Sequence, residues 1–92
     1  MSTAKNGRYT YIEKVSVAGE NVLENLFPAE YTHPVARKMT ISVNQDCVVL
    51  INGRDRVKIK PDLGLSLEYD DIEVKSLVTE TNGVNFYAIV AY

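Results

Sequence analysis

The sequence is poor in the residues from which small catalytic and metal sites are usually built. Its 92 residues include one cysteine, Cys47, and one histidine, His33. One cysteine cannot close an intrachain disulfide, and one cysteine with one histidine cannot supply a tetrahedral zinc site. No serine or cysteine stands in a nucleophile motif with His33, and Cys47 lies in an apolar run typical of a core strand. We therefore expect no enzyme activity, no metal and no cofactor.

Net charge and long hydrophobic stretches are also scarce. Ten lysine and arginine residues stand against twelve aspartate and glutamate residues, a formal net charge of −2. This near-neutral balance disfavours a protein that binds duplex DNA by broad phosphate neutralisation. No apolar run approaches the roughly 20 residues that span a bilayer, and residues 1–8 lack the apolar segment of a secretory signal. We expect a protein that is neither exported by that route nor embedded in a membrane.

The length of the chain leaves room for one hydrophobic core. A domain of this size buries roughly 60–65% of the surface of its unfolded chain, too little for a core plus a deep catalytic cavity. No linker divides the sequence. We therefore predict a flexible N-terminal arm at residues 1–8 and a single domain at residues 9–92.

Alternation of apolar and polar residues indicates β-strands along most of the chain. Met39, Ile41 and Val43 would share one face of a half-buried strand. The continuous apolar run from Cys47 to Ile51 is bounded by turn residues, as in a strand covered on both faces. Short strands separated by regular turns favour a sandwich. We predict an all-β fold, a single antiparallel β-sandwich of about seven strands, either jelly-roll-like or immunoglobulin-like.

Two stretches depart from regular alternation. In the first strand, Glu13 interrupts the face that holds Tyr9 and Tyr11, which predicts a bulge near Ile12-Glu13. Between Glu20 and Phe27 the apolar residues recur at helical spacing, and Pro28 ends the run. This second stretch allows one short helix.

Two Asn-Gly dipeptides, at Asn52-Gly53 and Asn82-Gly83, predict β-hairpins. A type I′ turn needs positive φ at both central residues, which asparagine tolerates and glycine adopts freely. Two-residue loops would also set the register of each hairpin. The opposed pairs would then be Ile51 with Arg54, Val49 with Arg56, Val48 with Val57, and Thr81 with Val84.

The arm that follows the first Asn-Gly turn has a distinctive charge pattern. Its alternate residues are basic and would share one face: Arg54, Arg56, Lys58 and Lys60. We call the segment that holds these four residues the basic arm. Val57 and Ile59 would point into the core. By the register above, the cations would lie beside the aliphatic side chains of Ile51, Val49 and Cys47. This face is either self-covered by its own long side chains, a protein interface, or a nucleic-acid contact, and the absence of an obvious stacking platform disfavours the last.

An acidic stretch follows in the sequence and comprises Glu68, Asp70, Asp71 and Glu73. It lacks the glycine-punctuated loop of a calcium site. We interpret it as a solvated turn. Its charge is opposite to that of the basic arm, so an acidic edge of one subunit would be able to meet the basic face of another.

The C-terminal strand is apolar on both faces. One face holds Val84, Phe86, Ala88 and Val90, and the other holds Tyr87, Ile89 and Ala91. Such a strand is central in its sheet, or one of its sides meets another subunit. The chain has six tyrosines and no tryptophan, and tyrosine offers a large contact area with a polar tip. The candidate interface residues are Tyr87, Ile89, Ala91, Tyr92, Arg54, Arg56 and Lys58, and the Tyr9/Tyr11 pair is open to the same two interpretations.

The order of strands and turns over the C-terminal half is the basis of a family resemblance. It runs through the segments 49–53, 57–59, 65–69, 72–79 and 83–92, with Asn-Gly at the end of the first and aromatic residues in the last. This order resembles that of small β-sandwich proteins of tailed-bacteriophage virions. The resemblance implies a non-enzymatic role in capsid decoration, in head or tail fibre attachment, or as a tail accessory. It also implies a symmetric homo-oligomer that is made in the host cytoplasm and docks on other virion proteins.

Two other functions remain open. One is a small carbohydrate- or receptor-binding module that recognises a cell-surface glycan, in which exposed tyrosines in a groove beside Asp or Asn would stack on sugar rings. The other is a nucleic-acid-binding β-barrel that uses Arg54, Arg56, Lys58 and Lys60 and whose affinity would depend steeply on salt.

Overall fold

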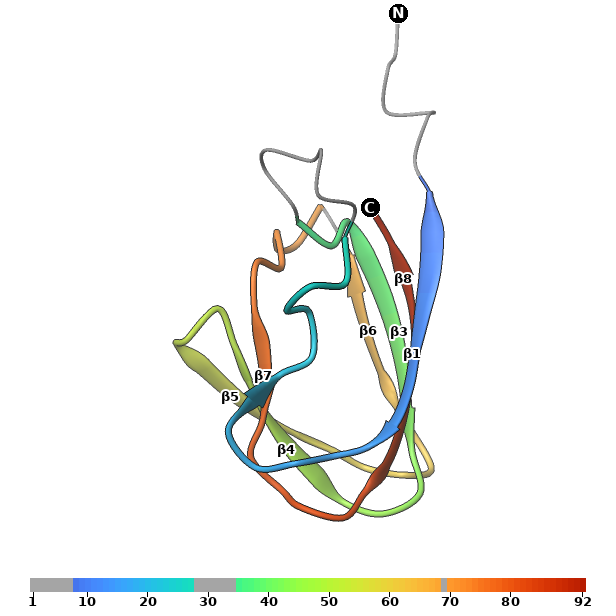
Figure 1. Cartoon of the computed structure of the whole chain (residues 1–92), viewed down its shortest axis with the longest axis vertical. Coiled ribbons are helices and arrows are strands. Elements are labelled where there is room, and N and C mark those ends of the chain that lie inside the picture. The colour runs from blue at the N-terminus through green and yellow to red at the C-terminus, as the bar shows by residue number, and fades with distance from the viewer. Residues whose placement is uncertain (1–7, 28–34, 69) are drawn as a thin grey trace, which may run out of the picture.

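The computed structural model describes residues 8–27, 35–68 and 70–92. These residues form eight strands in two antiparallel sheets of four strands, which confirms the predicted all-β sandwich (Figure 1). The first sheet contains, in spatial order, β1 (Tyr9–Val15), β8 (Asn85–Ala91), β3 (Lys38–Val43) and β6 (Leu65–Glu68). The second contains β2 (Glu20–Asn21), β7 (Leu77–Thr79), β4 (Cys47–Ile51) and β5 (Asp55–Ile59).

The order of the strands decides between the two sandwich types that the sequence left open. The chain forms nested antiparallel pairs, β1 with β8, β2 with β7, β3 with β6 and β4 with β5. Such pairs arise when one long hairpin is rolled up, and the rolling then brings β3 against β8 and β4 against β7. The resulting order is that of a jelly roll.

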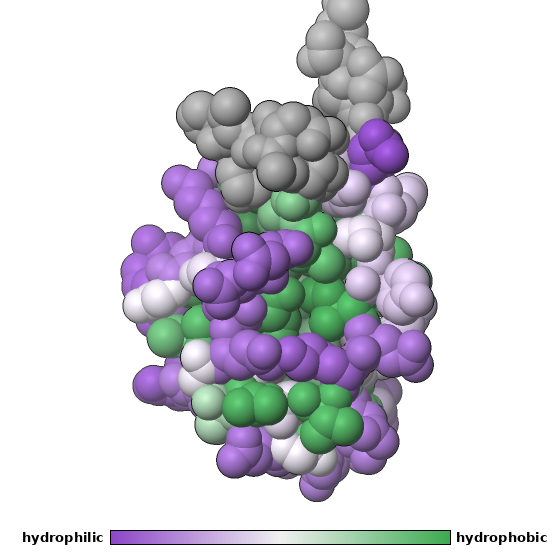
Figure 2. Space-filling model, in the orientation of Figure 1, coloured by the Kyte–Doolittle hydropathy of each residue, from purple (hydrophilic) through white to green (hydrophobic). Residues whose placement is uncertain are grey.

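The hydrophobic core lies between the two sheets. Every second residue of the central strands is buried there, including Met39 and Ile41 of β3, and Phe86 and Val90 of β8. Figure 2 shows hydrophobic residues gathered between the sheets and hydrophilic residues over β5. The inner faces predicted for β3 and for the C-terminal strand are therefore confirmed.

The first strand is regular, and the predicted bulge near Ile12-Glu13 is wrong. The register between β1 and β8 is constant from Tyr9 opposite Ala91 to Val15 opposite Asn85. Glu13 needs no bulge because its side of the strand faces solvent. Arg8, assigned to the arm by the sequence, continues this ladder by exchanging hydrogen bonds of 2.8 Å with Tyr92, and the remainder of the predicted arm lies outside the described residues.

The stretch from Glu20 to Phe27 contains strand β2 and consecutive turns rather than a helix. The turns are closed by hydrogen bonds from Glu24 N–H to Asn21 O and from Leu26 N–H to Leu23 O, both 3.2 Å long. They bury Val22 and Leu23 against the core, which explains the helix-like spacing of the apolar residues. The described residues include no helix, and so none that would cross a membrane.

The first Asn-Gly turn has the predicted backbone but not the predicted register. Asn52 and Gly53 have φ values of 55° and 69°, and Arg54 N–H donates to Ile51 O at 3.0 Å. The ladder resumes one residue later than predicted, with Ile51 opposite Asp55. Asn52 is held instead by the segment that precedes β7, because its N–H donates to Ser76 O and its Oδ1 accepts from Lys75 N–H.

Because of this one-residue shift, the aliphatic side chains beside the basic arm are not those predicted. Val49 lies opposite Val57 and Cys47 opposite Ile59, so these four side chains share the inner face. The aliphatic residues that share the outer side with Arg56 and Lys58 are Leu50 and Val48. Burial of the apolar face decides the register, because a shift of one residue would turn the whole apolar set toward solvent.

The second Asn-Gly dipeptide does not close a hairpin. It joins β7 in one sheet to β8 in the other, and Asn82 does not have positive φ. Its groups bind the connection after β1 instead: Asn82 Oδ1 accepts from Ala18 N–H at 2.6 Å, and Gly83 N–H donates to Ser16 O at 2.9 Å. Tertiary contacts therefore override the local preference for a type I′ turn.

Replacing Gly53 or Gly64 by alanine separates the conformational cost of positive φ from the cost of a close contact. The two residues have φ of +69° and +66°, but a Cβ at Gly53 would meet nothing within 4 Å, whereas one at Gly64 would lie 2.7 Å from Ile41 O. We expect Gly53→Ala to lower the free energy of unfolding by about 1 kcal/mol and Gly64→Ala by about 1–3 kcal/mol more. Urea denaturation measures both, and equal losses would contradict the close approach to Ile41.

Candidate functional site on the outer face of the first sheet

Large apolar side chains are exposed on the solvent side of the β1-β8-β3-β6 sheet. We call this group the outer face and define it as Tyr9, Tyr11, Val15, Tyr87 and Ile89. Their exposed fractions are 74%, 61%, 56%, 38% and 44%, respectively. All five lie on only two strands, β1 and β8.

The register of β1 and β8 brings these side chains together. Tyr11 lies directly opposite Ile89 and diagonally across from Tyr87, which is opposite Glu13. The rings of Tyr11 and Tyr87 are tilted by 33°, with centroids 6.1 Å apart, within the range of favourable aromatic pairs. Four of the five side chains therefore adjoin one another, whereas Val15 lies beyond Glu13 and opposite Asn85.

The remainder of the same sheet side is polar. On β3, the residues opposite Ile89 and Tyr87 are Thr40 and Ser42, both exposed. On β6, Ser66 lies opposite Thr40 and is also exposed. On this sheet side, the apolar surface of the described residues is therefore confined to the half that ends at the edge strand β1.

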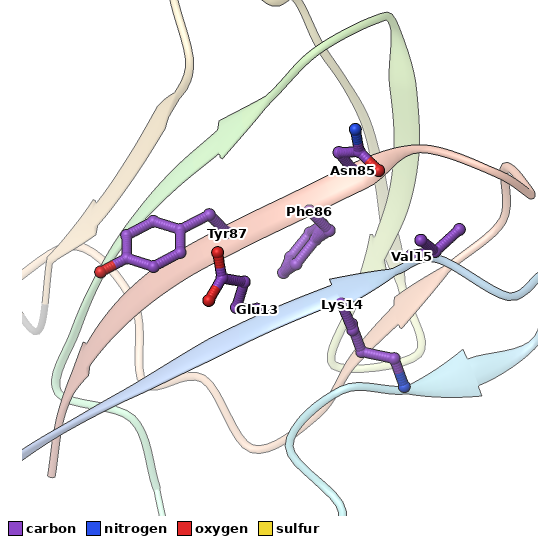
Figure 3. A pocket seen from close by; sticks show the side chains of 6 residues that line it. All are labelled: Glu13, Lys14, Val15, Asn85, Phe86 and Tyr87. Atoms are coloured by element: carbon purple, nitrogen blue, oxygen red, sulfur yellow. The ribbon is translucent and has the colours of Figure 1, made fainter.

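A hollow lies between β1 and β8 at one end of the outer face (Figure 3). Tyr87, Glu13 and Asn85 contribute an aromatic ring, a carboxylate and an amide. Figure 3 shows Glu13 beside Tyr87, whereas Lys14 extends toward β2, where it forms an ion pair with Glu20. The remaining lining residues are Val15 and Phe86.

The interface candidates predicted from the sequence divide between two surfaces. Tyr87 and Ile89 lie at the centre of the outer face, and Ala91 is paired with Tyr9 and Lys38 at one end. Tyr92 is half-buried with its ring 5.1 Å from that of Phe27. The three basic candidates, Arg54, Arg56 and Lys58, belong to the other sheet, in β5 and the turn before it.

Much of the positive charge of the basic arm is neutralised within the chain. Two of the three guanidinium nitrogens of Arg56 bind Glu80, with Nε 2.6 Å from Oε1 and Nη2 3.2 Å from Oε2. Arg54 and Lys60 pair with Asp55 and Asp46 at 3.3 Å and 3.4 Å. These contacts favour the self-covered interpretation of this surface.

Two other groups considered in the sequence, Cys47 and the acidic stretch, differ in burial. Cys47 is fully buried, as predicted for a core residue, and burial raises the pKa of its thiol. The acidic residues Glu68, Asp70, Asp71 and Glu73 are all exposed. No group of three His, Cys, Asp or Glu side chains in the described part of the chain is arranged to hold a metal ion, and His33 lies outside that part.

Sequence reasoning missed three residues that line the hollow. Val15, Glu13 and Asn85 were not among the candidates, although alternation along β1 and β8 places all three on the same side as Tyr11 and Tyr87. What alternation cannot supply is the pairing of the first strand with the last. That long-range contact assembles the outer face.

Comparison with known proteins adds no identification. No family model, no curated protein and no solved structure matches this chain. The class to which the chain belongs is therefore defined by its own topology, a small jelly-roll β-sandwich with an exposed apolar sheet face.

The ion pair between Arg56 and Glu80 predicts a specific pH dependence of stability. The hydrogen bond and positive charge of Arg56 lower the pKa of Glu80 below its ordinary value of 4.5. A carboxylate with a lowered folded-state pKa stabilises the protein above its unfolded-state pKa, and this contribution is lost as the pH falls through the lowered value. We expect Glu80→Gln to be slightly less stable at pH 7 and to show a smaller loss of stability below pH 4.5. Urea denaturation between pH 2 and pH 7 measures this, and parallel pH profiles would contradict it.

Proposed function

We propose that this protein is a non-enzymatic structural and assembly protein of a tailed-bacteriophage virion that works as a symmetric homo-oligomer. The observation that carries the proposal is the outer face, where Tyr9, Tyr11, Val15, Tyr87 and Ile89 are exposed together. Contiguous exposed apolar groups on a small protein mark an interaction surface. Most soluble oligomers are closed, symmetric assemblies of identical subunits, and such an assembly would cover this surface.

The architecture is compatible with this role. Jelly rolls occur in viral capsid proteins, in lectins and in cupins, and a fold alone does not specify which of these functions a protein has. The strand and turn order that resembles phage virion proteins directs the proposal to the virion. The charges of the basic arm are paired within the chain. This pairing favours the apolar outer face, rather than the surface of β5, as the contact surface.

Adding a charge to the outer face should dissociate the oligomer without unfolding the subunit. Ile89 is 44% exposed, so Ile89→Asp should lower the free energy of unfolding by about 1 kcal/mol or less. Light scattering over a concentration series should give a discrete oligomer for the native chain and a monomer for Ile89→Asp. Ser66→Asp is the matched control, because it adds the same charge to the polar half of the same sheet side. A native chain that is monomeric at every concentration would overturn the proposed assembly.

The virion placement has its own test. Phage particles should be purified from cultures in which the gene is expressed from its natural genome, and labelled with an antibody against the purified protein. We expect labelling at regularly repeated positions on the head or tail. Particles that neither bind the antibody nor contain the chain by mass spectrometry would contradict the virion role, even if the protein is an oligomer.

A second candidate function is favoured by the hollow beside the outer face. Tyr87 lies there with Asn85 and Glu13, which is the combination of an exposed ring and polar side chains expected of a carbohydrate-binding groove. In this alternative, Tyr87 would stack on a sugar ring while the carboxylate and amide bind its hydroxyl groups.

The carbohydrate alternative predicts a specific loss on mutation. Tyr87→Ala should weaken binding to any glycan found on an array by roughly tenfold or more, the effect of truncating an aromatic anchor. Tyr9→Ala is the matched control, because Tyr9 lies on the same sheet side but does not line the hollow. Failure of the native protein to bind any glycan would eliminate this alternative.

A further inference from the structure

The outward edge of β1 is not paired with any described strand. Arg8 and Tyr92 exchange hydrogen bonds, and Ser16 N–H donates to Val84 O, so the even-numbered residues of β1 bond to β8. In an antiparallel ladder the alternate residues direct their N–H and C=O groups to the opposite side. Those residues are Tyr9, Tyr11, Glu13 and Val15, and no described residue bonds to their backbone.

This edge is the best suited of the four sheet edges to pair with another strand. β1 has seven residues without proline or glycine, whereas the edge strands β6, β2 and β5 have four, two and five residues. Long regular edges promote pairing between chains, and charged side chains that point inward oppose it. The inward charge of β1 is Lys14, which is paired with Glu20 within the same chain.

We propose that two copies of the protein pair through β1, antiparallel to each other, with Ile12 of one copy opposite Ile12 of the other. This inference rests on the proposed oligomeric assembly and adds an edge-to-edge contact between subunits to the contact through the outer face. Because β1 is the edge of its sheet, pairing would join the two four-stranded sheets into one continuous sheet. The outer faces of both copies would then form one larger surface.

The sequence of β1 selects this register. The free backbone groups belong to odd-numbered residues, so only registers that oppose odd with odd residues satisfy them. Moving the centre by one residue toward the C-terminus places Glu13 opposite Glu13, and moving it toward the N-terminus places Lys14 opposite Arg8. Like charges in direct opposition destabilise a strand pair.

In the register centred on Ile12, all seven residues of β1 find a partner and no like charges are directly opposed. Tyr9 lies opposite Val15, Thr10 opposite Lys14, and Tyr11 opposite Glu13. The twofold symmetry repeats each of these pairs. Tyr9 of each copy therefore meets Val15 of the other at the two ends of the contact, and Tyr11 lies beside its centre.

Charge substitutions at Tyr11 and Glu13 test the register. Tyr11→Lys and Tyr11→Glu remove the same ring from a position that is 61% exposed, so both variants should fold. In the proposed register, Tyr11→Lys opposes lysine to glutamate at two sites, whereas Tyr11→Glu opposes glutamate to glutamate. We expect the dissociation constant, measured by sedimentation equilibrium, to be about tenfold or more higher for Tyr11→Glu than for Tyr11→Lys.

The same pair of substitutions in a Glu13→Lys background provides the control. The chain has a net charge of −2, so net charge alone also favours lysine over glutamate at position 11. With a lysine in place of Glu13, the proposed register predicts the reverse order, and the double variant that carries Tyr11→Glu should bind more tightly. The substitutions also change contacts within one subunit, and those changes are present in the monomer as well as in the oligomer. Thermal melting of the diluted monomer measures them separately from the contact between subunits.

The possible outcomes separate this inference from the proposed function. Reversal of the order in the Glu13→Lys background supports the β1 contact. If the native chain is an oligomer that Ile89→Asp dissociates but the order does not reverse, the β1 contact is wrong and the proposed assembly stands. If the native chain is a monomer at all concentrations, both are overturned.

Discussion

The antiparallel contact between β1 and β8, the first and last strands, is the interaction on which the rest of the structure depends. It is the outermost of the nested pairs that define the jelly roll. Because β8 is also paired with β3 on its other side, it occupies the centre of its sheet. Its inward side chains, including Phe86 and Val90, are then completely covered by the second sheet.

The same contact creates the surface on which the proposed function rests. Tyr11 and Tyr87 are 76 residues apart in the chain and have ring centroids 6.1 Å apart only because their strands are paired. The inner side of this strand pair holds the core, and its outer side carries exposed aromatic and aliphatic groups. Folding of the subunit and presentation of the outer face are therefore consequences of one ladder of hydrogen bonds.

At the end of the sandwich where β1 and β7 finish, the connections are held by buried polar groups rather than by strand pairing. The Ser16 hydroxyl donates to Thr81 O and accepts from Val84 N–H, and Thr79 Oγ1 donates to Val17 O. These bonds join the connection after β1 to the end of β7 and to the connection between β7 and β8. Every buried side-chain polar atom of the described residues has a hydrogen-bond partner, which removes the desolvation penalty that such groups would otherwise impose.

The sequence by itself determined the strands and the two faces of most of them, because alternation with a period of two is a local property of the chain. Residues 39–43 and 84–90 show this directly, since their predicted inner side chains are buried. The positive φ values at Asn52 and Gly53 were also predictable, because they are a local preference of that dipeptide. The register of the first hairpin was also predictable, because an apolar inner face requires Val49 to lie opposite Val57 rather than opposite Arg56.

Only the tertiary structure decided how the strands are connected and which of them meet. Asn82-Gly83 has the same dipeptide as the first turn but joins two sheets, because its side chain and backbone bind the chain at Ser16 and Ala18. The pairing of β1 with β8, and hence the outer face, involves residues at opposite ends of the sequence. Local patterns carry no information about such contacts, which are selected by the burial of the whole core at once.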